Sequence, residues 1–184
     1  VEHLLVFVYD ETGSPVALKY RTSAYAKGVY DLFFYEKNLQ GDIIGIYNAS
    51  GTKIGTYVYN AFGAGSTTLT SGITTLERKI VRTYNPFRYR GYYYDTQTSL
   101  YYLQSRYYDP DLGRFINPDS IDVITATPDQ LTDKNLFAYC DNNPIMRVDE
   151  DGEFWNIVAG GVIGGAIGAL TYTATTFITC EDFD

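Results

Sequence analysis

The 184-residue chain has 14 Lys and Arg against 22 Asp and Glu, and its formal net charge of -8 argues against nucleic acid as a partner. Its single histidine is His3, so a Ser-His-Asp triad or a histidine-built metal site is not expected, and any catalysis should rest on carboxylates. Hydrophobic residues make up 45% of the chain and charged residues 20%, which predicts a folded domain with a core and excludes a disordered chain.

From Val1 to about Asp119 the sequence repeats one pattern, in which a short run of Tyr, Val, Ile and Phe ends at a turn containing Gly, Asn or Asp. Residues 6–9 and 16–20 flank one such turn, and residues 43–47 and 54–59 flank another. Gly and Asn tolerate the positive φ of hairpin turns, so the pattern predicts successive antiparallel β-hairpins.

Tyrosine followed by Asp or Asn marks these units. The pairs are Tyr9-Asp10, Tyr30-Asp31, Tyr47-Asn48, Tyr59-Asn60, Tyr84-Asn85, Tyr94-Asp95 and Tyr108-Asp109. A repeat of roughly twenty residues predicts a sheet extended by stacking similar units. Because tyrosine packs its ring while its hydroxyl finds a polar partner, we interpret the tyrosines as mainly structural.

Two later segments depart from the repeat. Residues 63–72 are small and polar, which predicts an exposed loop. Thr127 as N-cap and Pro128 at the first helical position predict a short helix that ends near Asn135.

The C-terminal segment has no charged residue between Glu153 and Glu181, so residues 154–180 are long enough to span a bilayer as an apolar helix. Gly160, Gly164 and Gly168 have the spacing that lets helices approach closely. The Thr-rich second half weakens the membrane interpretation. A linker, a membrane contact through residues 154–180 and a buried helical segment stay open.

The densest motif reads YNPFRYRGYYYD from residue 84 and RYYDPDLGRFINPD from residue 106, followed by NNP from residue 142 and DEDGE from residue 149. Together with the preceding repeats it resembles the RHS repeat-associated core that closes a run of YD repeats, over roughly residues 1–154. The resemblance implies a mainly β fold in which antiparallel hairpins of YD repeats form part of a spiralling β-sheet shell. It implies YD repeats over residues 1–83, the core over 84–154, and a Gly-rich apolar linker or the start of a variable region over 155–184.

Toxin members of this family resemble intramolecular aspartic proteases, and the resemblance places the paired carboxylates at Asp109 and Asp119. Such a pair must share a proton, one group acting as base and the other as acid. Arg106 or Arg114 could hold one of them ionised. The alternative is that Asp109 only accepts backbone hydrogen bonds in a turn and Arg114 pairs structurally with a neighbouring acid.

The segment that matches the family's cleavage motif comprises Asp149, Asp151, Gly152, Glu153 and Phe154. It departs from the motif at Glu150, where the family favours Pro, and at Glu153, where it favours Leu. The acidic residues lack the spacing of a calcium loop, so neither a metal nor another cofactor is expected.

The resemblance implies a secreted or cell-surface bacterial protein that encloses and delivers a toxin. Its expected partners are its own C-terminal toxin segment, outside this chain, and the remaining YD repeats of the parent protein. The alternative is a non-enzymatic surface protein for adhesion or carbohydrate binding, and a weaker one is a fragment anchored in a membrane by residues 154–180.

Overall fold

The fold is built from antiparallel β-sheets, in a computed structural model that describes residues 2–118, 135–149, 152 and 156–157. The first sheet runs in chain order: β1 (His3–Tyr9), β2 (Pro15–Thr22), β3 (Asp31–Lys37), β4 (Ile43–Asn48), β5 (Lys53–Tyr59) and β6 (Gly65–Leu69). The second has the order β10-β9-β8-β7: β7 (Tyr93–Asp95), β8 (Leu100–Leu103), β9 (Arg106–Asp109) and β10 (Arg114–Phe115). β11 (Arg147–Val148) pairs with β12 (Asn156–Ile157). The predicted mainly β, antiparallel fold class is confirmed.

Four of the five turns that connect the strands of the first sheet share one hydrogen-bond pattern. In the turn after β4, Asn48 Oδ1 accepts the backbone N–H of Ser50 at 3.2 Å and of Thr52 at 2.9 Å, and Gly51 has a φ of 78°. The same arrangement follows Asp10, Asn38 and Asn60. The second residue of the Tyr-Asp or Tyr-Asn pair therefore folds three of these turns, because its side chain occupies the N–H groups that no strand partner reaches.

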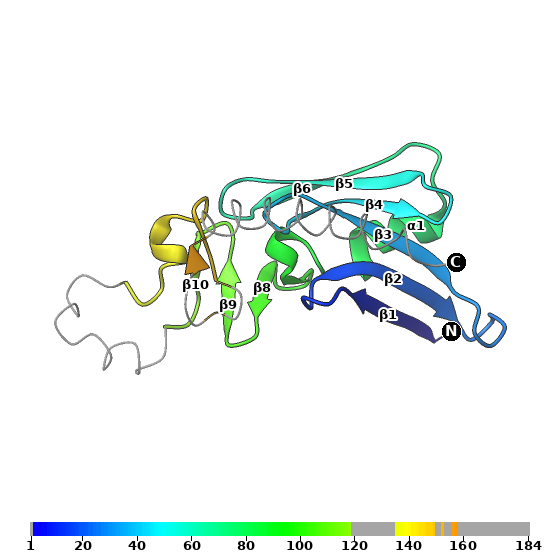
Figure 1. Ribbon diagram of the computed structural model, residues 1–184, viewed down its shortest axis with the longest axis horizontal. Coiled ribbons are helices and arrows are strands. Elements are labelled where there is room, and N and C mark those ends of the chain that lie inside the picture. The colour runs from blue at the N-terminus through cyan, green and yellow to red at the C-terminus, as the bar shows by residue number, and fades with distance from the viewer. Residues whose placement is uncertain (1, 119–134, 150–151, 153–155, 158–184) are drawn as a thin grey trace, which may run out of the picture.

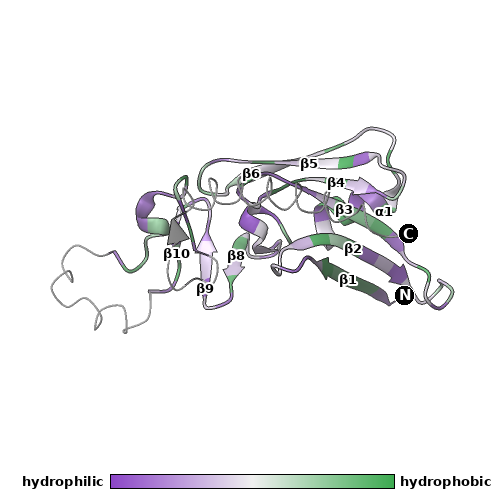
Figure 2. Cartoon of the chain, viewed as in Figure 1, coloured by the Kyte–Doolittle hydropathy of each residue, from purple (hydrophilic) through white to green (hydrophobic). Residues whose placement is uncertain are grey.

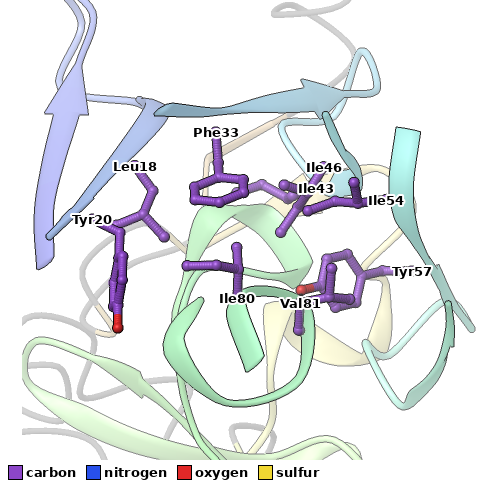
Figure 3. Packing of buried hydrophobic residues seen from close by; sticks show 9 residues of the cluster. All are labelled: Leu18, Tyr20, Phe33, Ile43, Ile46, Ile54, Tyr57, Ile80 and Val81. Carbon is purple, nitrogen blue, oxygen red and sulfur yellow. The ribbon is translucent and has the colours of Figure 1, made fainter. Parts of the chain in front are cut away.

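A helical segment fills the concave side of the six-stranded sheet (Figure 1). It comprises α1 (Thr75–Lys79) and a π-helical turn (Ile80–Tyr84), and Ile80 and Val81 are fully buried. Figure 3 shows these two side chains facing the sheet residues of the first core. That core comprises Leu18, Tyr20, Phe33, Ile43, Ile46, Ile54, Tyr57, Ile80 and Val81.

The second sheet packs around tyrosines instead of aliphatic side chains. Its core comprises Tyr89, Tyr92, Tyr101, Leu103, Tyr108, Phe115, Tyr139 and Cys140. Two further turns border it, the 3₁₀ turns Tyr89–Gly91 and Cys140–Asn142. The structural role that we assigned to the tyrosines agrees with this packing, since aromatic rings contribute more buried area per residue than aliphatic chains.

The first strand presents an apolar surface at the sheet edge. β1 is largely hydrophobic (Figure 2), and Leu4 and Val6 are 47% and 38% exposed. β1 has only β2 as a neighbour among the described strands. Its outer backbone groups therefore have no strand partner within the described ranges.

Several sequence predictions are corrected or fall outside the description. The predicted loop at 63–72 is wrong in part, because β6 pairs with β5 there, from Tyr59↔Gly65 to Gly55↔Leu69. The β-branched threonines of β6 suit an edge strand better than the small, polar composition suggested. The predicted helix ending near Asn135 lies outside the described residues. So does the apolar segment 154–180, except for Asn156 and Ile157, which are in β12 and not in a helix.

Candidate functional site

The predicted catalytic residue Asp109 ends β9 and is half-buried. Its Oδ1 accepts the backbone N–H of Asp111 at 2.9 Å and of Leu112 at 3.0 Å, and its carbonyl accepts the N–H of Gly113. These bonds form the turn into β10. Asp109 thus has the turn role that we considered as the alternative, and this role leaves Oδ2 for other chemistry.

Arg106 begins β9 and lies among the predicted cleavage residues. Its guanidinium Nη2 is 3.4 Å from Asp149 Oδ2, and its Nε donates to the carbonyl oxygen of Gly152. Its Nη1 donates to Leu136 O at 3.2 Å, and its Cζ lies 3.6 Å from the centre of the Phe115 ring. The side chains of Arg106 and Asp149 are 7% and 4% exposed, so this is a buried ion pair.

Asp149 fixes the same segment from its other side. Its Oδ1 accepts the N–H of Gly152 at 2.8 Å, and its carbonyl accepts the hydroxyl of Tyr92 at 2.6 Å. Gly152 has a φ of 78°, and a Cβ there would lie 2.7 Å from Leu103 O. Only glycine fits this position, because both the backbone angle and the space exclude a side chain. Residues 149 and 152 are therefore held against the second sheet by both backbone and side chain.

The remaining predicted residues do not join this cluster within the described ranges. Arg114 is exposed and pairs in register with Asp109 across the β9–β10 hairpin. Asp119, Asp151, Glu153 and Phe154 lie outside the described residues. Their predicted roles, like the catalytic role of Asp109, stay predictions.

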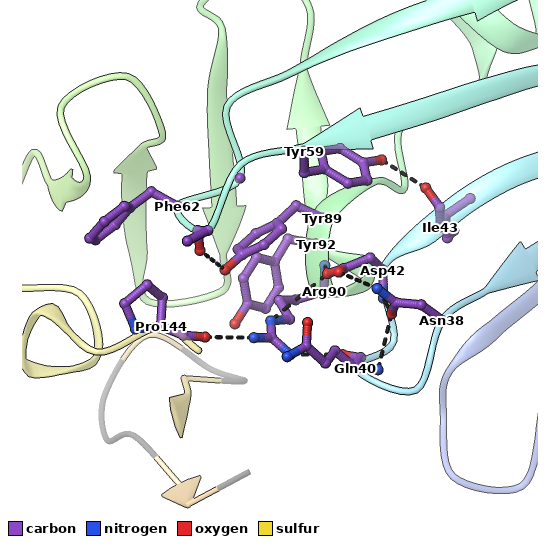
Figure 4. Close-up of polar contacts among 12 residues, drawn as sticks. Asn38, Gln40, Asp42, Ile43, Tyr59, Phe62, Tyr89, Arg90, Tyr92 and Pro144 are labelled. Carbon is purple, nitrogen blue, oxygen red and sulfur yellow. Dashed lines mark hydrogen bonds and ion pairs between the residues drawn. The ribbon is translucent and has the colours of Figure 1, made fainter. Parts of the chain in front are cut away.

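A second buried ion pair, between Arg90 and Asp42, joins the two sheets, and the sequence analysis did not predict it. Arg90 donates through Nη1 to Gln40 O at 3.2 Å and through Nη2 to Pro144 O at 2.6 Å (Figure 4). Its backbone N–H donates to Asp42 Oδ1 at 2.8 Å, and the two side chains are 2% and 7% exposed. A cavity of about 340 Å³ adjoins this pair, with Tyr59 and Tyr89 in its wall.

Tyrosine hydroxyls complete the junction at the turn between β5 and β6. Tyr89 donates to Ala61 O at 2.7 Å, Tyr101 to Gly63 O at 3.1 Å and Tyr108 to Phe62 O at 2.6 Å. Burial raises the pKa of the Tyr101 and Tyr108 phenols above their usual range, so both remain neutral donors at physiological pH. Three hydrogen bonds thus join the turn between β5 and β6 to tyrosines of the second core.

The only sequence signal for this junction is the alternation of Arg and aromatic residues in FRYRG, because arginine beside aromatic rings is typical of buried cation sites. No sequence signal predicts the positive φ of four non-glycine residues nearby, which are Arg90, Cys140, Asp141 and Asn142. Three consecutive non-glycine residues in the left-handed region are unfavourable in isolation. The surrounding contacts therefore impose this turn.

The described ranges hold neither a metal-binding cluster nor a membrane-spanning helix. No three His, Cys, Asp or Glu side chains of this part of the chain come together as metal ligands. None of its helices has the length and apolar character needed to cross a bilayer. The described thiol, Cys140, is buried and free, and burial raises its pKa to about 12.

No family model matches the chain, but individual proteins do. The chain is 38% identical over 130 residues to the tRNA nuclease WapA of Bacillus subtilis strain 168, which covers 70% of this chain and 5% of that protein. It is 36% identical over 83 residues to double-stranded DNA deaminase toxin A of Burkholderia cenocepacia strain H111, covering 45% of this chain and 5% of that protein. The chain thus spans 5% of the length of these two relatives.

A solved structure shares the fold. The crystal structure of TcdB2-TccC3-Cdc42 matches 86% of this chain and 7% of the other chain, with a TM-score of 0.60 and 26% sequence identity. The matched region is therefore a small part of that chain, as it is of the two relatives.

Proposed function

Because the chain belongs to the YD-repeat proteins with an RHS repeat-associated core, we propose that it forms the C-terminal part of a shell that encloses and delivers a toxin segment. The observation that carries the proposal is the buried clamp on Asp149 and Gly152. This clamp fixes the point from which the chain continues toward its C-terminal residues. An enclosed segment needs such an anchor.

The two hydrophobic cores support a division of the chain into parts with different roles. The first core draws on residues 18–81, and the second on residues 89–140. We propose that residues 1–83 extend the shell as YD repeats, that residues 84–154 close its end, and that residues 155–184 begin the linker or variable region. The hydrogen bonds of Tyr89, Tyr101 and Tyr108 would then seal the closure.

The exposed edge of β1 supports the remaining YD repeats of the parent protein as a partner. Leu4 and Val6 are large apolar side chains on a strand whose outer backbone groups lack a strand partner within the described ranges. A further antiparallel strand would pair with these backbone groups and bring its own side chains against Leu4 and Val6. We also propose that the whole protein is secreted or lies at the cell surface of a bacterium, in keeping with the delivery of a toxin.

Enclosure is tested by protease protection of the full-length protein. We expect its C-terminal segment to resist trypsin at concentrations that digest the same segment expressed alone, as measured by mass spectrometry. Heating the protein above its unfolding temperature should remove the difference. Equal digestion of the native protein and the isolated segment would contradict enclosure.

Self-cleavage near Gly152 is a second proposal, supported by one observation. The carbonyl oxygen of Gly152 accepts a hydrogen bond from the Arg106 guanidinium, which withdraws electron density from that carbonyl. In the proposed reaction one of Asp109 and Asp119 takes a proton from a water molecule that attacks the Gly152 carbonyl carbon. The other gives a proton to the leaving nitrogen, and the C–N bond after Gly152 breaks to leave a carboxylate and a free amine.

Asp109→Asn separates catalysis from the turn, because an amide oxygen can still accept the N–H groups of Asp111 and Leu112. We expect the full-length Asp109→Asn and Asp119→Asn variants to stay intact by mass spectrometry, whereas wild type and the exposed control Asp111→Asn are cut. A wild-type protein that stays whole would rule out cleavage and leave the enclosure proposal standing.

A further inference from the structure

The cavity beside Arg88 lies between the two sheets and is distinct from the Arg106 clamp. It has a volume of about 130 Å³, and its wall includes Arg88, Thr67, Tyr94, Ser99 and Asp111. Neither the shell nor the cleavage proposal uses this cavity.

Arg88 is a half-buried cation with few acceptors. Its guanidinium carries five N–H donors. Within the described ranges its one side-chain hydrogen bond is from Nη2 to Arg82 O at 3.3 Å, and Nε is buried without an acceptor. No carboxylate of this part of the chain forms an ion pair with it.

Aromatic rings hold the guanidinium in place. Its Cζ lies 4.2 Å from the ring centre of Tyr94 and 5.6 Å from that of Tyr57. These contacts stabilise the cation but offer it no hydrogen-bond acceptor in the plane of the guanidinium. In a chain of net charge -8, a cation that has lost part of its water and has no acid partner is unusual.

We propose that this cavity binds a small oxyanion, with the Arg88 guanidinium as its principal ligand. An oxyanion accepts charge-assisted hydrogen bonds in the guanidinium plane, and the hydroxyls of Thr67 and Ser99 add neutral donors at the wall. Asp111 is the opposing charge, since this exposed acidic residue also lines the cavity and would repel an anion. The cavity is large enough for one such group and too small for a drug-sized ligand.

Calorimetric titration of the intact protein at constant ionic strength tests the site, with phosphate and acetate as the two oxyanion probes and chloride as the control. We expect saturable one-site binding of at least one oxyanion and none of chloride. Saturation by phosphate alone identifies a tetrahedral group as the ligand, and saturation by acetate identifies a carboxylate. Equal, unsaturated responses to all three anions would overturn the proposal.

Variants then assign the site. Arg88→Gln should weaken binding about tenfold or more, whereas Arg82→Gln removes an exposed charge nearby, keeps its backbone carbonyl and should leave the affinity unchanged. Equal losses in both variants would mean a general effect of charge and refute the site. Asp111→Asn should tighten binding by about threefold, because the repulsion is gone. If Arg88→Gln does not fold, an unchanged affinity in Asp111→Asn counts against the site.

Discussion

The Arg106–Asp149 pair leads to a quantitative prediction for the substitution Asp149→Asn. In the wild type the N–H of Gly152 lies 2.8 Å from Asp149 Oδ1. Asparagine keeps an oxygen that accepts this N–H and removes only the charge. The Arg106 guanidinium, 7% exposed, then loses the negative charge of Asp149 beside it. Breaking a buried pair by removing one partner typically costs about 3–5 kcal/mol. Because Arg106 keeps the carbonyl oxygens of Gly152 and Leu136, we expect a loss of about 3 kcal/mol.

The assay is urea unfolding followed by far-UV circular dichroism. With a denaturant slope of about 2–3 kcal/mol per molar urea for a chain of this size, the midpoint should fall by about 1–1.5 M at an unchanged slope. The matched control is Asp141→Asn, which breaks an ion pair with Arg147 whose two side chains are 53% and 27% exposed. That exposed pair should contribute less than about 1 kcal/mol. Equal midpoints for the two variants would refute the buried clamp.

Three further predictions concern the turns and the tyrosine core. Gly152→Ala should destabilise the protein more than Gly13→Ala in thermal unfolding, because both have a φ near 80° but only a Cβ at Gly152 meets neighbouring atoms, at 2.6 Å from Ser105 Oγ. Asn60→Ala should cost about 1–2 kcal/mol, and Asn60→Asp little, in the same assay, since the oxygen accepts two backbone N–H groups. Burial raises the pKa of Tyr57 from 10.0 to about 12, so its contribution to stability is present below pH 10 and is lost as the pH rises through 12. The tyrosinate absorbance that wild type shows in excess of the Tyr57→Phe variant, followed with circular dichroism against pH, should therefore appear only as the fold is lost.

The local parts of the fold were predictable because their causes are local. The Tyr-Asp and Tyr-Asn pairs indicated turns, and Asp10, Asn48 and Asn60 fold those turns through hydrogen bonds within five residues. The start of α1 was also predictable from local sequence, because Thr74 and Glu77 have the spacing of a capping box. For β6, composition favoured a loop, but pairing with β5 overrode it. Whether such a segment forms an edge strand depends on the strand it pairs with, and the sequence of the segment alone does not show that partner.

The candidate site was predictable only in its residue types. Arg106 and Asp149 were both selected from the motif, yet their pairing spans 43 positions and depends on how the second sheet closes. Arg90 and Asp42, 48 positions apart, were not selected at all. A charge in the sequence does not indicate its own burial, because burial follows from the tyrosines that surround it. The excess of tyrosine and two of the arginines of the motif are thus linked, because phenol rings pack over the guanidinium groups of Arg88 and Arg90 and shield them from water.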